Sequence, residues 1–171
     1  ERFPQDIPIL FTGAQACPFG SLSDYPKITG IWAEHLIAEN LELGRQLFPS
    51  TQEVLVVSDG ELLEECVHAH WEKQWQTIPG LRIRLINGTS ATTEQLLETV
   101  AGLPRNSFVI FSSWRRSTQD GFPSIRAVID QIRERSLVPI FVTRNDFMVR
   151  GVLGGHVMDA TLYGEETTSL M

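Results

Sequence analysis

The chain has 171 residues, of which 42% are hydrophobic and 20% are charged, and its formal net charge is −7. This length suits one domain with a sizeable core, and the composition excludes a disordered, collagen-like or disulfide-rich chain. The acidic balance argues against a surface for nucleic acid or for an anionic membrane. No apolar run approaches the roughly 20 residues that span a bilayer. Because the chain begins at Glu1 without methionine, we expect it to be a piece of a longer protein.

Five short apolar runs recur along the chain, and each is bounded by turn residues. They cover residues 7–11, 53–57, 81–86, 107–111 and 138–142. Four of these runs are nearly continuous rather than alternating. Continuous runs indicate strands that are covered on both faces.

Apolar side chains at helical spacing fill the segments between the runs. These stripes cover residues 36–48, 63–78, 96–100 and 125–132, and another helix begins near Gly164. Prolines stand just beyond three of the predicted helices, at positions 49, 79 and 104. Thr92 and Gln95 have the spacing of a capping box at the start of the third stripe. Residues 14–27 form the longest irregular stretch.

Alternating strands and helices predict parallel β-α-β units with right-handed crossovers. We therefore expect a single α/β domain over residues 1–171, a flavodoxin-like three-layer α/β/α sandwich with a mostly parallel sheet.

Ligands of open α/β sheets bind beyond the carboxyl ends of the strands. The predicted strands are followed there by small, polar and aromatic residues, at positions 12–13, 58–60, 87–89, 112–114 and 143–147. Such a rim suits a small polar molecule that has an apolar part. The same residue types also make ordinary turns, and this alternative stays open for each residue.

The usual catalytic motifs are missing from the sequence, including a G-x-S-x-G elbow, a P-loop and G-x-G-x-x-G. Cys17 and Cys66 form no C-x-x-C pair or zinc pattern. His68 and His70 are two residues apart on a predicted helix and point to different faces, which is poor metal-ligand geometry. His156 follows a glycine and could face the crevice, although a lone histidine is usually structural.

A phosphoreceiver needs acidic residues after the first strand, an aspartate after the third and a lysine after the fifth. The corresponding strands here are followed by Thr12, Asn87 and Thr143, so we reject that interpretation. Trp114 with Arg115 and Arg116 could hold a carboxylate and an aromatic group, or it could be a packed tryptophan in a solvated loop.

Three stretches carry a resemblance to a known family: IPILFTGA, YPKITGIWAEHLIAENLELGRQLFPSTQEVLVVSDG, and VPIFVTRNDFMVRGVLGGHVMD leading into YGEET. Their order resembles periplasmic-binding-protein-like domains of the ABC-transporter substrate-binding type, including those built into bacterial sensor histidine kinases. The resemblance implies a clamshell of two α/β lobes that closes on a small solute, of which this chain supplies one lobe and lacks the first.

The positions that match the family's crevice are Thr12, Gly13, Ser58, Asp59, Trp114, Asp146 and Phe147. In a binding module of this kind, we expect Asp146 to accept hydrogen bonds from an ammonium or hydroxyl, Ser58 and Thr12 to add polar contacts, and Phe147 or Trp114 to stack on the ligand. Glycines at positions 151, 154 and 155 would let the backbone approach the neighbouring lobe.

We therefore expect a non-enzymatic sensor domain of a bacterial signal-transduction protein of the histidine-kinase type, extracytoplasmic, with signalling domains downstream. Its expected partner is a small polar or amino-acid-like ligand, without cofactor, metal or nucleic acid; a homodimer stays open. The alternatives are the solute-binding component of an ABC transporter, a flavodoxin-like enzyme with Asp59 and Asp146 as acid-base groups, and a structural dimerisation domain.

Overall fold

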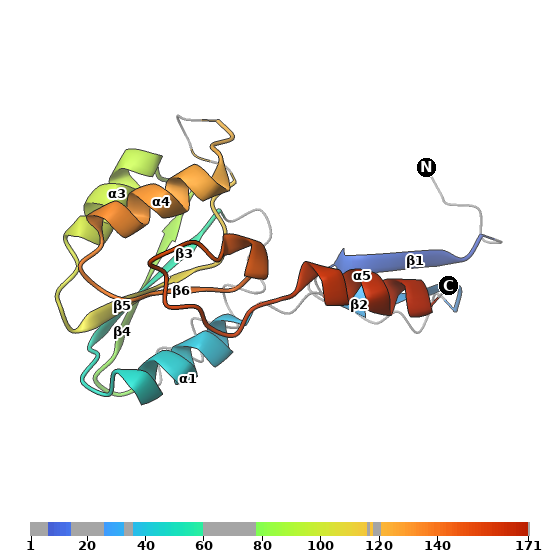
Figure 1. Cartoon of the computed structure of the whole chain (residues 1–171), viewed down its shortest axis with the longest axis horizontal. Coiled ribbons are helices and arrows are strands. Elements are labelled where there is room, and N and C mark those ends of the chain that lie inside the picture. The colour runs from blue at the N-terminus through green and yellow to red at the C-terminus, as the bar shows by residue number, and fades with distance from the viewer. Residues whose placement is uncertain are drawn as a thin grey trace. The chain divides into compact units, whose positions relative to one another are not determined.

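The computed structural model describes residues 7–14, 26–32, 36–59, 78–115, 117 and 121–170 (Figure 1). The chain forms two compact units, Glu1–Glu34 with Asp159–Met171, and His35–Met158. The predicted helix over residues 63–78 lies outside the described residues except for its last position, and both cysteines lie outside them. The prediction of one domain over residues 1–171 stays a prediction.

The second unit is built on a four-stranded parallel sheet with the order β4-β3-β5-β6. Its strands are β3 (Glu53–Ser58), β4 (Arg82–Asn87), β5 (Ser107–Phe111) and β6 (Ile140–Val142). Every residue of β3, β5 and β6 is buried, which confirms the expectation drawn from their continuous apolar runs. β4 lies at one end of this sheet and alternates between exposed and half-buried residues over Arg82–Leu85.

The two faces of this sheet are covered by different helices, so the unit has three layers (Figure 1). Helix α1 (Ile37–Leu47) packs on the face that carries Val54, Val56, Phe108, Ile110 and Phe141. Helices α3 (Thr93–Ala101) and α4 (Ile125–Arg135) pack on the opposite face, which carries the intervening strand residues. The α/β class, the mostly parallel sheet and the three layers agree with the prediction.

The predicted capping box at the start of α3 is confirmed. The Thr92 hydroxyl accepts from the Gln95 amide at 3.1 Å, and the Gln95 side chain accepts from the Thr92 amide at 2.8 Å. The apolar stripe of this helix, Leu96, Leu97 and Val100, is buried as its spacing predicts.

The first unit contains strands β1 (Ile9–Ala14) and β2 (Ile28–Trp32), paired in parallel, and helix α5 (Ala160–Ser169). β2 was not predicted from the sequence, and α5 begins at Ala160, before the predicted start near Gly164. The first strand also does not join the large sheet, because it pairs with β2. The Phe11 and Trp32 rings lie 4.4 Å apart, and the Tyr163 hydroxyl of α5 donates to the Trp32 carbonyl at 3.1 Å.

The chain beyond β6 turns through a short 3-10 helix, η2 (Asn145–Phe147), and then returns so that residues 153–154 lie beside β6 in the parallel direction. The Leu153 amide donates to the Ile140 carbonyl at 2.8 Å, and the Val142 amide donates to the Gly154 carbonyl at 2.9 Å. Gly155 adopts φ +140°, and a Cβ there would overlap the Asn40 side chain. The close approach that this glycine permits is therefore to α1 of the same unit.

Candidate functional site

The strand order places a topological switch point between β3 and β5. β3 is followed in sequence by β4 on one side, and the chain then crosses to β5 on the other side. Crevices at such switch points, outside the carboxyl ends of the strands, are where open α/β sheets bind ligands. The side chains that follow β3, β5 and β6 are therefore the candidates for a site.

Asp59, directly after β3, is hydrogen-bonded to the loop that follows β5. Its carboxylate accepts from the Ser113 hydroxyl and from the Arg115 amide, each at 2.8 Å. The Ser112 and Ser113 amides both donate to the Val57 carbonyl, at 2.9 and 3.3 Å. Asp59 is 3% exposed, so these bonds satisfy a carboxylate that has little access to water. The result is a rigid junction at the switch point.

Ser58 lies at the same edge of the sheet but is also buried. Its carbonyl accepts from the Gly88 amide at 2.9 Å, which ties the end of β3 to the loop after β4. The predicted residues Ser58 and Asp59 thus sit together at the switch point and face the interior of the junction more than the solvent.

The two predicted aromatic residues belong to the core. Trp114 is fully buried, and its indole N–H donates to the Thr93 hydroxyl at the start of α3 at 3.1 Å. Phe147 is 3% exposed and packs edge-on against Phe111 at a centroid distance of 5.5 Å. In this structure neither ring presents a face for a ligand to stack on, and both rings pack in the core.

Arg144 and Asp146 form an ion pair at the end of β6. The arginine Nε and Nη2 donate to the two carboxylate oxygens at 2.8 and 3.0 Å, and its guanidinium carbon lies 5.2 Å from the centre of the Phe147 ring. The hydrogen bond and charge of Arg144, with a further electrostatic contribution from Arg115, lower the pKa of Asp146 below its usual value, against a smaller opposing effect of burial. Asp146 therefore carries a negative charge at neutral pH.

Thr12 and Gly13, the other two predicted site residues, lie on β1 in the first unit, and both are exposed. The Thr12 hydroxyl accepts from the Thr167 hydroxyl of α5 at 2.9 Å. Gly13 has φ +69°, a left-handed conformation that favours glycine. Five of the seven predicted residues thus lie in the second unit, near the carboxyl ends of β3, β5 and β6.

Ser113 and Arg144 belong to the predicted polar rim but are not among the seven predicted ligand-binding residues, and Asn40 was not predicted as a structural residue. Ser113 and Arg144 follow strands, as the predicted residues Asp59 and Asp146 do. Their hydrogen bonds to Asp59 and Asp146 become visible in the folded structure. Asn40 is fully buried on the apolar face of α1, at helical spacing from Ile37, Leu41 and Gly44. A polar residue on an apolar stripe was the available signal.

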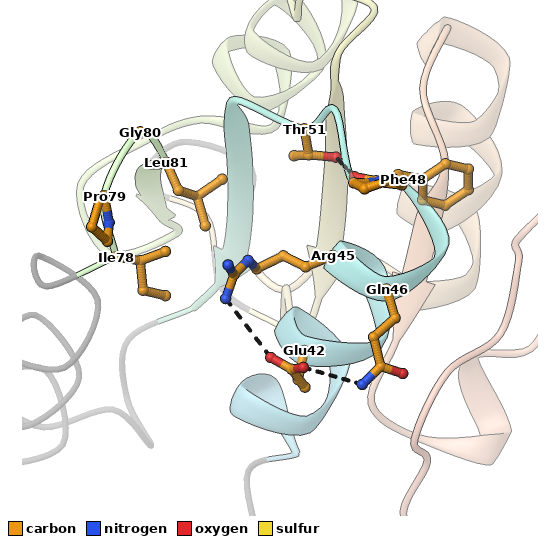
Figure 2. Close-up of a pocket in the computed structure, with 10 residues that line it drawn as sticks. Glu42, Arg45, Gln46, Phe48, Thr51, Ile78, Pro79, Gly80 and Leu81 are labelled. Carbon is orange, nitrogen blue, oxygen red and sulfur yellow. Dashed lines mark hydrogen bonds and ion pairs between the residues drawn. The ribbon is translucent and has the colours of Figure 1, made fainter.

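The hollow drawn in Figure 2 lies at the other edge of the sheet and has a volume of about 290 Å³. It is bordered by the end of α1 and by residues just before β3 and β4, and these include Phe48, Thr51 and Leu81. On its wall Glu42 accepts from Gln46 at 3.1 Å and lies 3.8 Å from Arg45. Since the strands begin here, this hollow is separate from the switch point.

Within the described ranges of the chain, no three histidine, cysteine, aspartate or glutamate side chains are grouped so that they could hold a metal ion. The described helices include none with the length and apolar character of a membrane span. Comparison of the chain with protein-family models, with curated proteins and with solved structures finds no match.

Proposed function

We propose that this chain is a non-enzymatic, small-molecule-binding sensor domain of a bacterial signal-transduction protein of the histidine-kinase type. The observation that carries the proposal is the convergence of Asp59, Ser113, Arg115 and the Arg144–Asp146 pair at the carboxyl edge of a parallel sheet. The resemblance in sequence to periplasmic-binding-protein-like domains supports the same location. A solute held there would shift an equilibrium between open and closed lobes, which a kinase can detect.

The state of the two carboxylates favours binding over catalysis. Both oxygens of Asp59 are engaged by Ser113 and Arg115, and both oxygens of Asp146 are engaged by Arg144. A general acid or base works best with a pKa near the operating pH and needs access to the reacting proton. Asp146 has a lowered pKa and Asp59 is buried, so neither suits that role as placed.

The decisive experiment is a two-dimensional amide NMR titration of the chain with a library of amino acids, organic acids, amines and neutral polar solutes. We expect saturable shifts at the amides of Ser112, Ser113, Arg115 and Thr143, with the solute recovered unchanged. The amides of Thr51, Gly80 and Leu81 report on the hollow of Figure 2 and provide the internal control. Shifts confined to that hollow, or conversion of the solute, would rule out the proposal.

A further inference from the structure

Two guanidinium groups stand at the carboxyl ends of neighbouring strands, Arg115 after β5 and Arg144 after β6. Both act on one carboxylate, because the charges of Arg144 and of Arg115 each lower the pKa of Asp146. The backbone of Arg115 is fixed by the bond from its amide to Asp59, while its side chain is exposed. This edge of the sheet therefore carries cationic groups on a rigid base.

Arg144 is held in place by two side chains before any ligand arrives. Asp146 binds it through two hydrogen bonds, and the buried Phe147 ring lies beside its guanidinium. Phe147 is itself fixed by its edge-on contact with Phe111. Holding a flexible side chain in one position before binding removes much of the entropy cost of recognising a ligand.

The Arg144–Asp146 pair still has N–H donors for a ligand. A guanidinium has five N–H donors, and two of those on Arg144 point to Asp146, which leaves about three for another acceptor. No other residue in the described part of the chain takes them. An anion could accept from these remaining N–H donors without displacing Asp146.

The charges at the carboxyl ends of these strands also favour an anion as the ligand. Arg144 and Asp146 neutralise each other, and the Asp59 charge is buried in the junction. Among the residues that the structure describes, Arg115 has no ion-pair partner, so it contributes positive charge to the exposed rim. That charge would attract a small anion.

We propose that the solute bound at this edge is a small organic acid, whose carboxylate accepts hydrogen bonds from Arg144 and faces the charge of Arg115. This inference rests on the proposed function, because it names the ligand class of the same site. Charge-assisted bonds between a guanidinium and a carboxylate are short and strongly directional, which gives an acid a clear advantage over its amide.

The test compares acids with their matched amides by isothermal titration calorimetry: benzoate with benzamide, succinate with succinamide, and L-phenylalanine with L-phenylalaninamide, with inorganic phosphate as a separate anion. We expect at least one acid to bind at least about 10-fold more tightly than its amide, as the loss of a charged hydrogen-bond acceptor implies. Arg144→Gln should weaken that acid by about 10- to 100-fold. Arg115→Gln should weaken it by less and reduce its dependence on salt.

Two further variants separate recognition from folding. Arg144→Lys keeps the charge but loses the planar fork, and we expect it to bind the acid more weakly than the wild-type chain and more tightly than Arg144→Gln. Arg105→Gln removes an exposed charge just before β5, at the opposite edge of the sheet, and should leave binding unchanged. The amide NMR spectrum of each variant verifies that it is folded.

The outcomes distinguish this inference from the sensor proposal. If amides bind as tightly as acids, if phosphate is preferred to every acid, or if folded Arg144→Gln binds the acid normally, the inference is overturned and the sensor proposal remains. A chain that binds no member of the wider solute library at this edge overturns both.

Discussion

The Asn40 side chain pairs with the backbone of His156 as a neighbouring strand would. Its Oδ1 accepts from the His156 amide at 2.9 Å, and its Nδ2 donates to the His156 carbonyl at 2.8 Å. The same Nδ2 also donates to the Leu36 carbonyl at 2.6 Å. Leu36 has φ +44°, which is unusual for a residue with a side chain. One buried amide thus holds the start of α1 and the segment beyond β6 together within the second unit.

Replacing this amide with an apolar group of similar size should destabilise the second unit. In Asn40→Leu, the His156 amide and carbonyl lose their partners, and we expect a loss of about 1–3 kcal/mol in the free energy of unfolding. Urea denaturation measures it. Gln46→Leu is the matched control, because Gln46 is an exposed amide on the same helix and its loss should cost less than about 0.5 kcal/mol. Equal urea midpoints for Asn40→Leu and the wild-type chain would show that the Asn40 hydrogen bonds add no stability.

Two helical glycines should respond to alanine in opposite directions. A Cβ on Gly44 of α1 would overlap the Phe108 ring, which is fully buried and packs on Phe141 at 5.2 Å, so Gly44→Ala should lose about 1–3 kcal/mol. Gly164 of α5 has open space around it, and Gly164→Ala should stabilise that helix by up to about 1 kcal/mol. Thermal unfolding tests the first variant, and amide hydrogen exchange in α5 tests the second. Stabilisation by Gly44→Ala would contradict the close packing of α1 on β5.

The bond between Asp59 and Ser113 should show energetic coupling. Asp59→Asn removes the negative charge and one of the two acceptor oxygens of this buried group, and Ser113→Ala removes its hydroxyl donor, so each should cost about 1.5–3 kcal/mol. The double variant should cost less than the sum, with a coupling energy of about 0.5–3 kcal/mol from a urea-unfolding cycle. Asp130→Asn, an exposed carboxylate on α4, should change stability by less than about 0.5 kcal/mol. Additive losses would mean that the two side chains act independently.

The pKa of Asp146 should depend on Arg144. Removing the guanidinium in Arg144→Gln should raise this pKa toward the usual value of 3.8, as measured by carbon-13 NMR titration of the carboxyl group. Arg115→Gln should raise it less, and Arg150→Gln, an exposed arginine further along the chain, should leave it in place.

The sign of the stability effect follows from the direction of this shift. Because the folded-state pKa is lowered, the ion pair stabilises the fold above the unfolded pKa, and this contribution disappears as the pH falls through the folded-state pKa. Asp146 is half exposed, so the contribution should be no more than about 1 kcal/mol and should shrink in high salt. Asp146→Asn should therefore lower the urea midpoint at pH 7 and match the wild-type chain near pH 2. A deficit that persists unchanged at pH 2 would point to packing instead of charge.

The amino-acid sequence alone predicts the elements that depend on neighbouring residues. Continuous apolar runs predicted strands β3, β5 and β6, helical spacing predicted the buried face of α3, and Thr92 with Gln95 predicted its first turn. It also placed Ser58, Asp59 and Asp146 after strands that end at one edge of the sheet. Periodicity and capping act over a few residues, so they can be seen in the chain.

Whether each of these residues is exposed at the edge of the sheet or buried in the protein becomes visible in the folded chain alone. Trp114 and Phe147 follow strands as exposed residues would, yet both pack in the core. β1 has an apolar run like the other strands, yet it pairs with β2 in a separate sheet. Asn40 and His156 are 116 positions apart, and Asp59 and Ser113 are 54 apart. Burial and hydrogen bonding of this kind depend on distant segments meeting, which local pattern does not encode.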